Sequence, residues 1–534
     1  MKRRTQLLFF VVLFQGVIVF SQVNKFSIRT IQSDTTWSSD TIRIFNNITI
    51  ENSATLSVLE GVYVEFQDHY FIEVKGVLNA YGNKYDSITF TIKDTTGFSD
   101  TATIVGGWGG IRYMRSESND TSFLNYCNFS YGKAVKPGDV GYYKNENNGG
   151  CLSAIEYPNI VISNSSFINN RANNFGGATH FIECDNVEIK ECSFMNNFTY
   201  KRGGGIYIEN AEYFIIRNNL FYKNTAYEVL DINGETGAGS GVHVSQRPGN
   251  GNGCIESNRF FNNKSVNGAI YESCFRIRVI NNIIANNYGV GLGEGITMTF
   301  NALFANNTIV NNWGWIVPAL WFNAHQTKMV NNIIWGNESA PSFGHQIYSS
   351  QGGITANISY SCIQDGYDGE GNTSKYPDFV NPTAGSGLEF DALNANWLLL
   401  DSSPCINMGT TDTTGYNLPL FDILGNQRVY GYRIDMGALE NQNIVSLPED
   451  KLISSRIKIA PNPFKEKLSV YLNNKIQINR IKVYNQSGII VKEIENIISS
   501  DQYIIDLSRF QSGMYFLHLE YKDGSLGVEK IIKL

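Results

Sequence analysis

The sequence predicts an all-β protein: a solenoid of stacked short strands followed by a small β-sandwich. Three observations lead to this fold class. An apolar residue closely followed by Asn or a small polar residue returns eight times, in steps of 24 to 39 residues. Around these marks lie short runs in which apolar and polar residues alternate, a period typical of strands. A polar linker at 441–455 then precedes a chain end richer in Ile and Lys.

The eight marks indicate stacked supersecondary units instead of one compact core. They begin at Phe167, Phe194, Phe221, Phe260, Ile284, Ile309, Ile334 and Ile363. Parallel strands stack about 4.8 Å apart, so equivalent positions of successive units form ladders through the protein. Asn suits the turns because it tolerates left-handed backbone and hydrogen-bonds to its neighbours. We therefore interpret the Asn columns as structural.

Composition narrows the functional classes. Of 534 residues, 17% are charged and 13% aromatic, and the net charge is −7. A disordered chain is less apolar than this, and a general nucleic-acid binder is basic. A repeat array can reach this length without a single central core.

The N-terminus predicts export. Residues 1–21 have a basic start, an apolar run at 7–20 and a small residue, Ser21, before a cleavage site at Gln22. This pattern is typical of a secretory signal peptide, and the apolar run is short for a membrane span. No later stretch is long and apolar enough to span. We assign 22–41 to a polar lead-in and 42–440 to the solenoid.

Eight cysteines raise the question of disulfides in an exported chain. They are Cys127, Cys151, Cys184, Cys192, Cys254, Cys274, Cys362 and Cys405. Measured from the repeat marks, no two lie in one column of adjacent units, which favours buried free thiols. None has metal-ligand spacing with His, so zinc is not expected.

The first part of the chain resembles secreted, pectin-lyase-like proteins with a right-handed parallel β-helix. The stretches that carry the resemblance are 48–66, 74–80, 88–90, Trp-Gly-Gly-Ile at 108–111, Pro-Cys-Ile-Asn-Met-Gly at 404–409 and Ile-Asp-Met-Gly-Ala-Leu-Glu at 434–440. The resemblance implies a right-handed parallel β-helix solenoid for 42–440. It is weak for activity, since this fold hosts lyases, hydrolases and non-catalytic adhesins.

The chain end resembles a type IX secretion C-terminal sorting domain. The matching stretches are Ala-Pro-Asn-Pro-Phe at 460–464, then 481–488, Gly-Met-Tyr-Phe-Leu at 513–517 and 529–534. The resemblance implies a β-sandwich at 456–534 that the outer-membrane secretion machinery recognises. It assigns the sorting signal to Pro461, Asn462, Pro463, Phe464, Gly513, Tyr515, Lys530 and Lys533.

A second mark, here called the glycine mark, precedes the apolar mark and opens a strand. It consists of Gly149-Gly150, Gly176-Gly177, Gly203-Gly204, Gly239 to Gly241 and Gly268. No helix follows it, which argues against a phosphate-binding loop. Alternation in this strand places one column outward: Ser153, His180, Tyr207, His243, Tyr271, Thr297 and Trp321. We hypothesise that Tyr207, Tyr271 and Trp321 stack on the sugar rings of a polysaccharide. His180 and His243 would hydrogen-bond to it or transfer protons. The alternative is that aromatic residues simply favour strands.

Carboxylates beside this column suggest chemistry on the polymer. Glu183 and Glu209, with Glu156 and Glu272, would provide the pair that glycoside hydrolysis needs. A lyase instead needs a base and cations, and Lys201, Arg202, Arg247, Arg276 and Arg278 lie nearby in coil order. Three functions stay open: polysaccharide binding, a polysaccharide lyase or glycoside hydrolase, and a structural or adhesive surface protein. No cofactor is expected, although calcium is an alternative to an ordinary turn at Asp365, Asp368 and Glu370.

Overall fold

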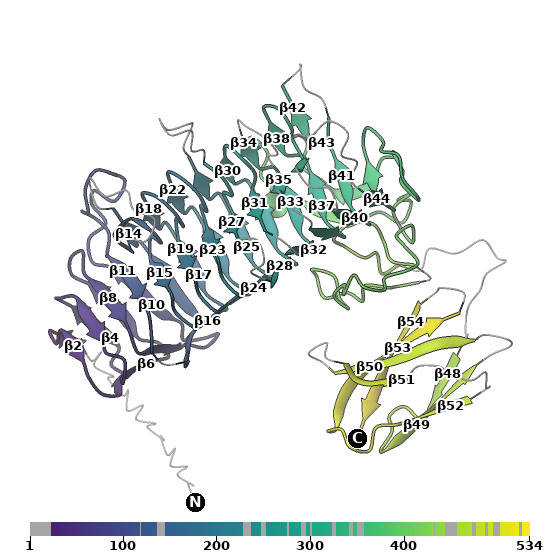
Figure 1. Cartoon of the computed structure of the whole chain (residues 1–534), viewed down its shortest axis with the longest axis horizontal. Coiled ribbons are helices and arrows are strands. Elements are labelled where there is room, and N and C mark those ends of the chain that lie inside the picture. Colours follow the sequence, from purple (N-terminus) through teal and green to yellow (C-terminus); the bar gives the residue numbers. More distant parts are fainter. Residues whose placement is uncertain are drawn as a thin grey trace, which may run out of the picture.

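A computed structural model describes most of the chain between residues 23 and 534. The gaps are 118, 136–144, 228–236, 247–251, 275–276, 290–294, 299–301, 323–326, 341–344, 350–356, 432, 444–456, 473–476, 486–489, 495–501 and 523–525. The predicted signal peptide and most of the predicted linker lie outside the described residues. The described chain forms a long solenoid and a smaller antiparallel domain at the C-terminus (Figure 1).

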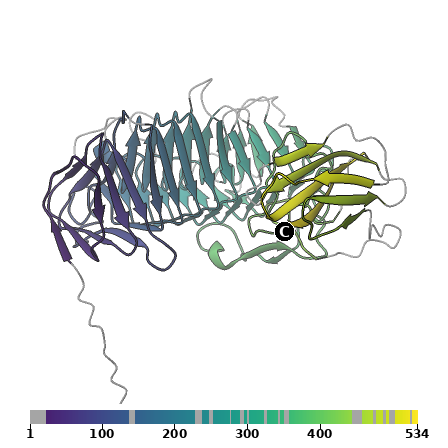
Figure 2. The same cartoon turned by 90° about the horizontal axis from the view of Figure 1, so that it is seen from below.

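Three parallel sheets run the length of the solenoid and a fourth joins them part-way, and Figure 2 shows their strands stacked side by side. Sheet I consists of β1 (Val23–Phe26), β4 (Thr41–Ile44), β7 (Tyr63–Phe66), β10 (Ile88–Ile92), β13 (Cys127–Ser130), β17 (Ser166–Ile168), β21 (Ser193–Met195), β25 (Leu220–Tyr222), β29 (Arg259–Phe261), β33 (Ile283–Ala285), β37 (Thr308–Val310), β41 (Ile333–Trp335) and β45 (Cys362–Ile363). Sheet II consists of β2 (Thr30–Ile31), β5 (Ile48–Ile50), β8 (Phe71–Val74), β11 (Gly110–Tyr113), β15 (Leu152–Ile155), β19 (Thr179–Ile182), β23 (Ile206–Glu209), β27 (Val242–Ser245), β31 (Ile270–Ser273), β35 (Ile296–Met298), β39 (Leu320–Phe322) and β43 (Ile347–Ser349).

The third sheet completes each coil, and a fourth begins part-way along the solenoid. Sheet III consists of β3 (Thr35–Trp37), β6 (Thr55–Leu59), β9 (Val77–Tyr81), β12 (Thr121–Asn125), β16 (Asn159–Ser163), β20 (Asn186–Lys190), β24 (Tyr213–Arg217), β28 (Asn252–Glu256), β32 (Ile277–Ile280), β36 (Leu303–Ala305), β40 (Lys328–Val330) and β44 (Asn357–Ser359). Sheet IV consists of β14 (Lys133–Ala134), β18 (Arg171–Ala172), β22 (Phe198–Thr199), β26 (Thr225–Ala226), β30 (Lys264–Ser265), β34 (Tyr288–Gly289), β38 (Trp313–Gly314) and β42 (Glu338–Ser339). A 3₁₀ turn, η1 (Asn145–Asn147), precedes β15.

The first coil corrects the predicted lead-in at 22–41. β1, β2 and β3 pair in parallel with β4, β5 and β6. Ile31 and Trp37 are buried in the same core as the later coils. The polar residues between them made this segment look like a lead-in. In a solenoid, however, only the inward positions of a strand need to be apolar.

The apolar residues of the repeat marks lie in the core of the solenoid. Phe129, Phe167, Phe194, Phe221 and Phe260 occupy paired positions of sheet I and are fully buried. Their rings stack at centroid distances of 5.0, 4.6, 5.0 and 4.6 Å. Offset stacking at this spacing adds to the hydrophobic stabilisation of each coil.

The two Asn residues of each pair after a mark have different structural roles. The first Asn adopts the left-handed conformation, with φ of 55° at Asn169 and 53° at Asn262. The second Asn is buried and bridges coils: Asn197 Oδ1 accepts from the backbone and the side chain of Asn170, both at 3.0 Å. This ladder consists of Asn170, Asn197, Asn224, Asn263, Asn287, Asn312 and Asn337. The structural role predicted for the Asn columns is confirmed.

A second buried Asn ladder lies at the turn from sheet III to sheet I. It consists of Asn219, Asn258, Asn282, Asn307 and Asn332. Each side chain again accepts from the coil before it, as Asn258 Oδ1 does from Asn219 N at 2.9 Å. Buried amide groups that are satisfied in this way hold the coils in register.

The glycine mark is required by geometry. Gly176 has φ of +67°, and a Cβ there would lie 2.2 Å from the Thr179 carbonyl oxygen. Only glycine combines this left-handed backbone with such a close approach.

The parallel coils end at β45, so the predicted solenoid range of 42–440 contains two parts. Residues 364–443 form a segment, here called the flank, that packs along the outside of the last coils. It includes the antiparallel strands β46 (Phe379–Asn381) and β47 (Asn396–Leu399) and the 3₁₀ turn η2 (Ala392–Asn394). Apolar residues of the flank, among them Trp397 and Met436, share a core with Ile283 and Ile333. Left-handed Asn residues of the coils bind the backbone of the flank. For example, Asn286 Nδ2 donates to Gly385 O at 2.8 Å.

The C-terminal domain is a β-sandwich, as predicted. One sheet contains β48 (Ile457–Ala460), β49 (Lys467–Leu472) and β52 (Gln502–Asp506). The other contains β51 (Ile490–Ile494), β50 (Ile478–Asn485), β53 (Gly513–Tyr521) and β54 (Leu526–Lys533). Alternating apolar residues, such as Leu517 and Leu519, are buried between the two sheets. Among the described residues, no helix is long and apolar enough to cross a membrane.

Candidate functional site

The predicted outward column exists in the expected register on sheet II. Ser153, His180, Tyr207, His243 and Tyr271 occupy paired positions from β15 to β31. The column continues through Thr297 to Trp321. Ring centroids lie 5.5 Å apart for His180 and Tyr207, 5.0 Å for Tyr207 and His243, and 4.8 Å for His243 and Tyr271. The rings therefore stack on one another.

Most of this column is buried, which contradicts its predicted role as a platform for sugars. Ser153 and His180 are 0% exposed, and Tyr207 and His243 are 1% exposed. Among the column residues whose burial is described, Tyr271 and Trp321 are the partly accessible ones. The segment with the glycine mark lies directly against the rings: the Phe175 ring lies 4.8 Å from that of Tyr207. Alternation tells which side chains leave the coil interior, but it does not tell what packs on them afterwards.

Burial also removes the predicted proton chemistry. It lowers the pKa of His180 to about 3, helped by the positive charge of Arg112, and it lowers that of His243 well below its ordinary value. Both imidazoles are therefore neutral at neutral pH. His180 Nδ1 lies 2.8 Å from Ser153 Oγ, inside the protein. We conclude that this contact orients the stack and that neither histidine transfers protons to an external substrate.

The carboxylates near the column occupy turns or contact other groups of the protein. Glu209 Oε2 accepts the Tyr207 hydroxyl at 2.8 Å, and Glu183 lies at a left-handed turn with φ of 51°. Glu156 is 3.7 Å from Arg115. Glu272 lies inside the coil, paired with Val244, and its Oε2 accepts the Cys274 N–H at 2.9 Å.

The three described basic residues of the predicted lyase set have different neighbours. Lys201 lies over the Phe175 ring, with its Nζ 6.0 Å from the centroid. Arg202 is bridged through its backbone to Phe175. Arg278 donates to flank carbonyls, including that of Tyr416 at 3.4 Å. Arg247 and Arg276 lie outside the described residues.

A different row of side chains, on sheet IV, is partly accessible: Lys264 and Glu338 are exposed, whereas Lys133 is buried. It consists of the first residue of each strand of sheet IV. In register these are Lys133, Arg171, Phe198, Thr225, Lys264, Tyr288, Trp313 and Glu338. The strands that carry them follow one another along one long edge of the solenoid (Figure 1).

Aromatic and cationic groups lie close to one another along this row. Arg171 Cζ lies 4.4 Å from the Phe198 ring centroid. Lys264 Nζ lies 6.0 Å from the Tyr227 centroid and 5.9 Å from that of Tyr288. The Tyr288 and Trp313 rings stack at 4.9 Å with an interplanar angle of 9°. Cation–π contacts of this kind hold long basic side chains in place.

Two rings at the strand ends keep accessible faces. Tyr227 is 51% exposed and Trp315 is 52% exposed. Trp315 stands at 66° to Trp313, so the two rings meet by an edge and not by their faces. Tyr200 completes the group, with its ring 6.3 Å from that of Tyr227. We call this group the aromatic strip: Phe198, Tyr200, Tyr227, Lys264, Tyr288, Trp313 and Trp315.

The sequence analysis missed the aromatic strip although its signal was present. Asn pairs mark this turn in several coils, and the position immediately after them is aromatic at Phe198, Tyr288 and Trp313. The glycine marks directed attention to sheet II instead. Exposure distinguishes the two columns, and exposure depends on what packs against each sheet.

The acidic turn proposed for calcium has other partners. Asp365 Oδ2 accepts the Gln346 N–H at 3.3 Å. The Glu370 carboxylate accepts the Tyr360 hydroxyl. Within the described parts of the chain, no group of three or more His, Cys, Asp or Glu side chains is arranged to hold a metal ion.

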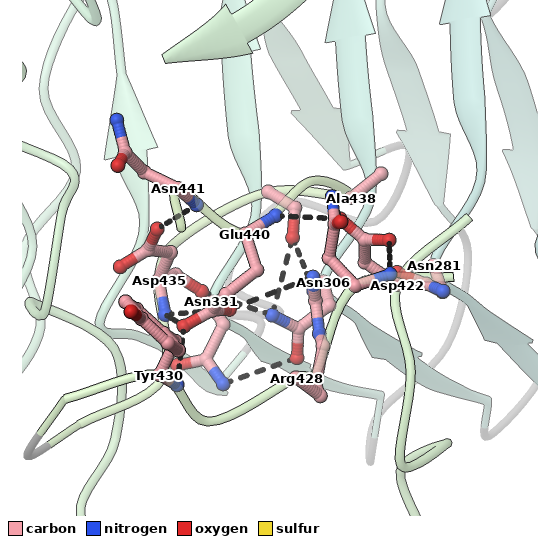
Figure 3. Close-up of polar contacts among 12 residues, drawn as sticks. Asn281, Asn306, Asn331, Asp422, Arg428, Tyr430, Asp435, Ala438, Glu440 and Asn441 are labelled. Atoms are coloured by element: carbon pink, nitrogen blue, oxygen red, sulfur yellow. Dashed lines mark hydrogen bonds and ion pairs between the residues drawn. The ribbon is translucent and has the colours of Figure 1, made fainter. Parts of the chain in front are cut away.

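A buried charged network closes the flank onto the coils (Figure 3). Arg428 and Glu440 form an ion pair at 3.8 Å with side chains 2% and 0% exposed. Asp435 accepts the N–H groups of Asn407 at 2.6 Å and Asn441 at 2.8 Å. Burial raises the pKa of Asp435 to about 6. Burial likewise raises the pKa of Glu440 and lowers that of Arg428.

The network is attached to the solenoid through a ladder turn. Asn306 Nδ2 donates to Asp435 O at 3.1 Å and to Gly437 O at 3.2 Å. The closing stretch at 434–440, which carried part of the β-helix resemblance, therefore joins the flank to the coils.

The predicted sorting residues meet along β54. Asn462 Nδ2 donates to Lys530 O, and Asn462 Oδ1 accepts the Ile532 N–H, both at 2.8 Å. Phe464 is buried and bridges Lys533. Lys533 Nζ donates to Phe510 O at 2.6 Å.

The remaining sorting residues complete this arrangement. Gly513 pairs with Lys533 across β53 and β54, and the Tyr515 hydroxyl donates to Gln511 O at 2.6 Å. Both Pro461 and Pro463 follow cis peptide bonds in the connection between β48 and Phe464. The motif residues are thus distributed over the edge strand β54, its neighbour β53 and the connection after β48.

Comparison with known families agrees with these two folds. Residues 142–293 match the family model of a right-handed beta helix region, and residues 458–534 match that of a secretion system C-terminal sorting domain. The chain is a β-helix protein with a type IX sorting domain. Its sorting domain directs export to the cell surface or beyond it. A search of curated proteins finds no match.

Proposed function

We propose that this exported β-helix protein binds a polysaccharide along the aromatic strip of sheet IV. The observation that supports the proposal is the pair of half-exposed rings, Tyr227 and Trp315, on one edge of the solenoid. Large apolar surfaces that remain exposed on a soluble protein typically mark interaction sites. Aromatic faces pack well against the C–H faces of sugar rings, because both are flat and partly apolar.

The geometry suits an extended polymer. Tyr227 follows β26 and Trp315 follows β38, three coils further along sheet IV. At about 4.8 Å per coil, the two rings are roughly 14 Å apart along the solenoid axis. Lys264 lies between them and would donate to a hydroxyl or carboxylate of the polymer. A chain of sugars lying along the axis would contact both rings at once.

Binding is the function that the strip supports best. Hydrolysis would require a carboxylate pair beside the bound sugar. The carboxylate in the sheet IV row, Glu338, accepts the Ser386 hydroxyl at 2.7 Å. The lyase and hydrolase alternatives therefore rest on the fold alone, and the same experiment tests them.

The test is a panel of pectic, other uronic and neutral glycans incubated with the purified full-length protein. We expect retention on at least one glycan. The double variant Tyr227→Ala/Trp315→Ala should weaken binding by about 10- to 100-fold, since each stacked ring contributes roughly 1 kcal/mol. Tyr85→Ala is the matched control, because Tyr85 is 88% exposed on a turn between β9 and β10.

The possible outcomes distinguish glycan binding from lyase and hydrolase activity. Unchanged affinity in the folded double variant would exclude the strip as the site. No retention on any glycan would contradict polysaccharide binding itself. New unsaturated ends would indicate a lyase, and new reducing ends without them would indicate a hydrolase.

A further inference from the structure

Two cysteines from distant parts of the chain meet where the flank closes on the last coil. Cys362 lies on β45 and points away from the coil interior, whereas Cys405 belongs to the flank. Both are 0% exposed and lie in one apolar cluster with Ile333, Met436 and Ala438. Within this cluster the Cys362 thiol is close enough to Cys405 to raise the pKa of its thiol.

The surroundings hold this pair in place from both sides. Cys362 Sγ also lies 3.1 Å from Lys375 O. The backbone of Cys405 donates to Ser403 Oγ at 3.2 Å and accepts the Met436 N–H at 3.0 Å. Two short segments that are anchored independently thus bring their thiols together.

The other cysteines differ from this pair. Cys127, Cys151, Cys184 and Cys192 direct their thiols at backbone carbonyl oxygens of the coils. Cys254 directs its thiol at the Glu256 carboxylate. These positions fit the buried thiols expected from the repeat. Cys405 escaped that analysis because it lies in the flank, outside the repeat units.

We propose that Cys362 and Cys405 form a disulfide in the exported protein. Exported chains fold in oxidising surroundings, where two adjacent thiols are oxidised. Two S–H bonds break and one S–S bond forms. The two electrons and two protons pass to a disulfide of the cell envelope, carried by a protein or a small thiol compound, which becomes a dithiol.

The order of events follows from burial. Thiol–disulfide exchange needs a thiolate, and in the folded protein the contact with Cys362 and burial raise the pKa of Cys405 well above its ordinary value. No oxidant reaches a fully buried thiol. The exchange therefore precedes the packing of the flank, and the finished bond locks the flank onto β45.

Thiol counting on the protein collected from outside the cell tests the proposal. The protein is unfolded in denaturant with an alkylating reagent, and its mass is measured with and without prior reduction. We expect six of the eight cysteines to be labelled without reductant and all eight after reduction. Peptide mapping should find the segments around residues 362 and 405 linked in the unreduced sample only.

Two variants sharpen the result. In Cys405→Ser, all seven remaining cysteines should be labelled without reductant. In Cys254→Ser, the control, five should be labelled without reductant and seven after it. Labelling of all eight cysteines in the unreduced wild-type protein, or a link between any other pair, would overturn the proposal.

Discussion

Replacing Asn263 by Ala should open the solenoid locally, because this side chain joins three coils. Asn263 is 0% exposed. Its Oδ1 accepts from Asn224 N at 2.9 Å and from Asn224 Nδ2 at 3.0 Å. Its Nδ2 donates to Phe221 O and to Asn287 Oδ1, both at 2.9 Å. Alanine removes all four hydrogen bonds and leaves the Asn224 N–H and the Phe221 carbonyl buried.

The expected cost follows from these contacts. A buried hydrogen bond contributes about 1 kcal/mol net, so four of them give about 4 kcal/mol. Since every 1.4 kcal/mol is a factor of ten, the coils around residue 263 should open about 1,000-fold more often. The effect should stay local, because each unit of a repeat array contacts only its neighbours.

Amide hydrogen exchange measures this opening directly. The protection of the Asn224 N–H should fall by about three orders of magnitude, while that of strands β4 to β8 stays unchanged. Asn159→Ala is the control: its Nδ2 makes one exposed hydrogen bond, to Asn119 O, and its loss should cost less than about 1 kcal/mol. Equal protection in the wild-type protein and Asn263→Ala would refute the structural role of the ladder.

Three further predictions concern the flank, the glycine mark and export. Burial raises the pKa of Asp435 to about 6 in the folded protein, against 3.8 for an unperturbed Asp, so the folded state binds the proton more tightly and stability rises as pH falls through 6. Denaturant titrations at pH 7 and pH 5 should show a gain of about 1 kcal/mol in the wild-type protein that Asp435→Asn lacks; an identical pH dependence would contradict this account. Gly176→Ala should lower the unfolding free energy by at least about 2 kcal/mol, measured by the same titration, because Cβ would meet the Thr179 carbonyl at 2.2 Å. Deleting 456–534 should leave the protein in the periplasm, and immunoblots that find normal amounts outside the cell would argue against the sorting assignment.

The sequence alone sufficed for the parts of the fold that repeat or pair locally. The period of the marks predicted the stacked coils, whereas the ring stack from Phe129 to Phe260 is seen only in the structure. Turn chemistry predicted the role of the Asn columns, because left-handed backbone and side-chain hydrogen bonds depend on the residue and its immediate neighbours. Local strand patterns likewise predicted the sandwich.

The first coil shows one limit of such reasoning. Between Val23 and Trp37 the strands are two to four residues long and largely polar. A run this short carries too little periodicity to identify as a strand. Only its pairing with β4, β5 and β6 shows that it belongs to the solenoid.

What the sequence could not determine is which outward column meets solvent. His180 and Lys264 both leave the coil interior, yet His180 is 0% exposed and Lys264 is exposed. Exposure depends on segments far away in the chain, and no local pattern encodes that packing. The same holds for the flank, which places Cys405 beside Cys362 and buries Asp435 with Arg428. The sequence by itself thus determined the coils, the Asn ladders between them and the C-terminal sorting domain. Only the tertiary structure decided which surfaces remain for a partner, because burial is a property of all the surrounding segments together.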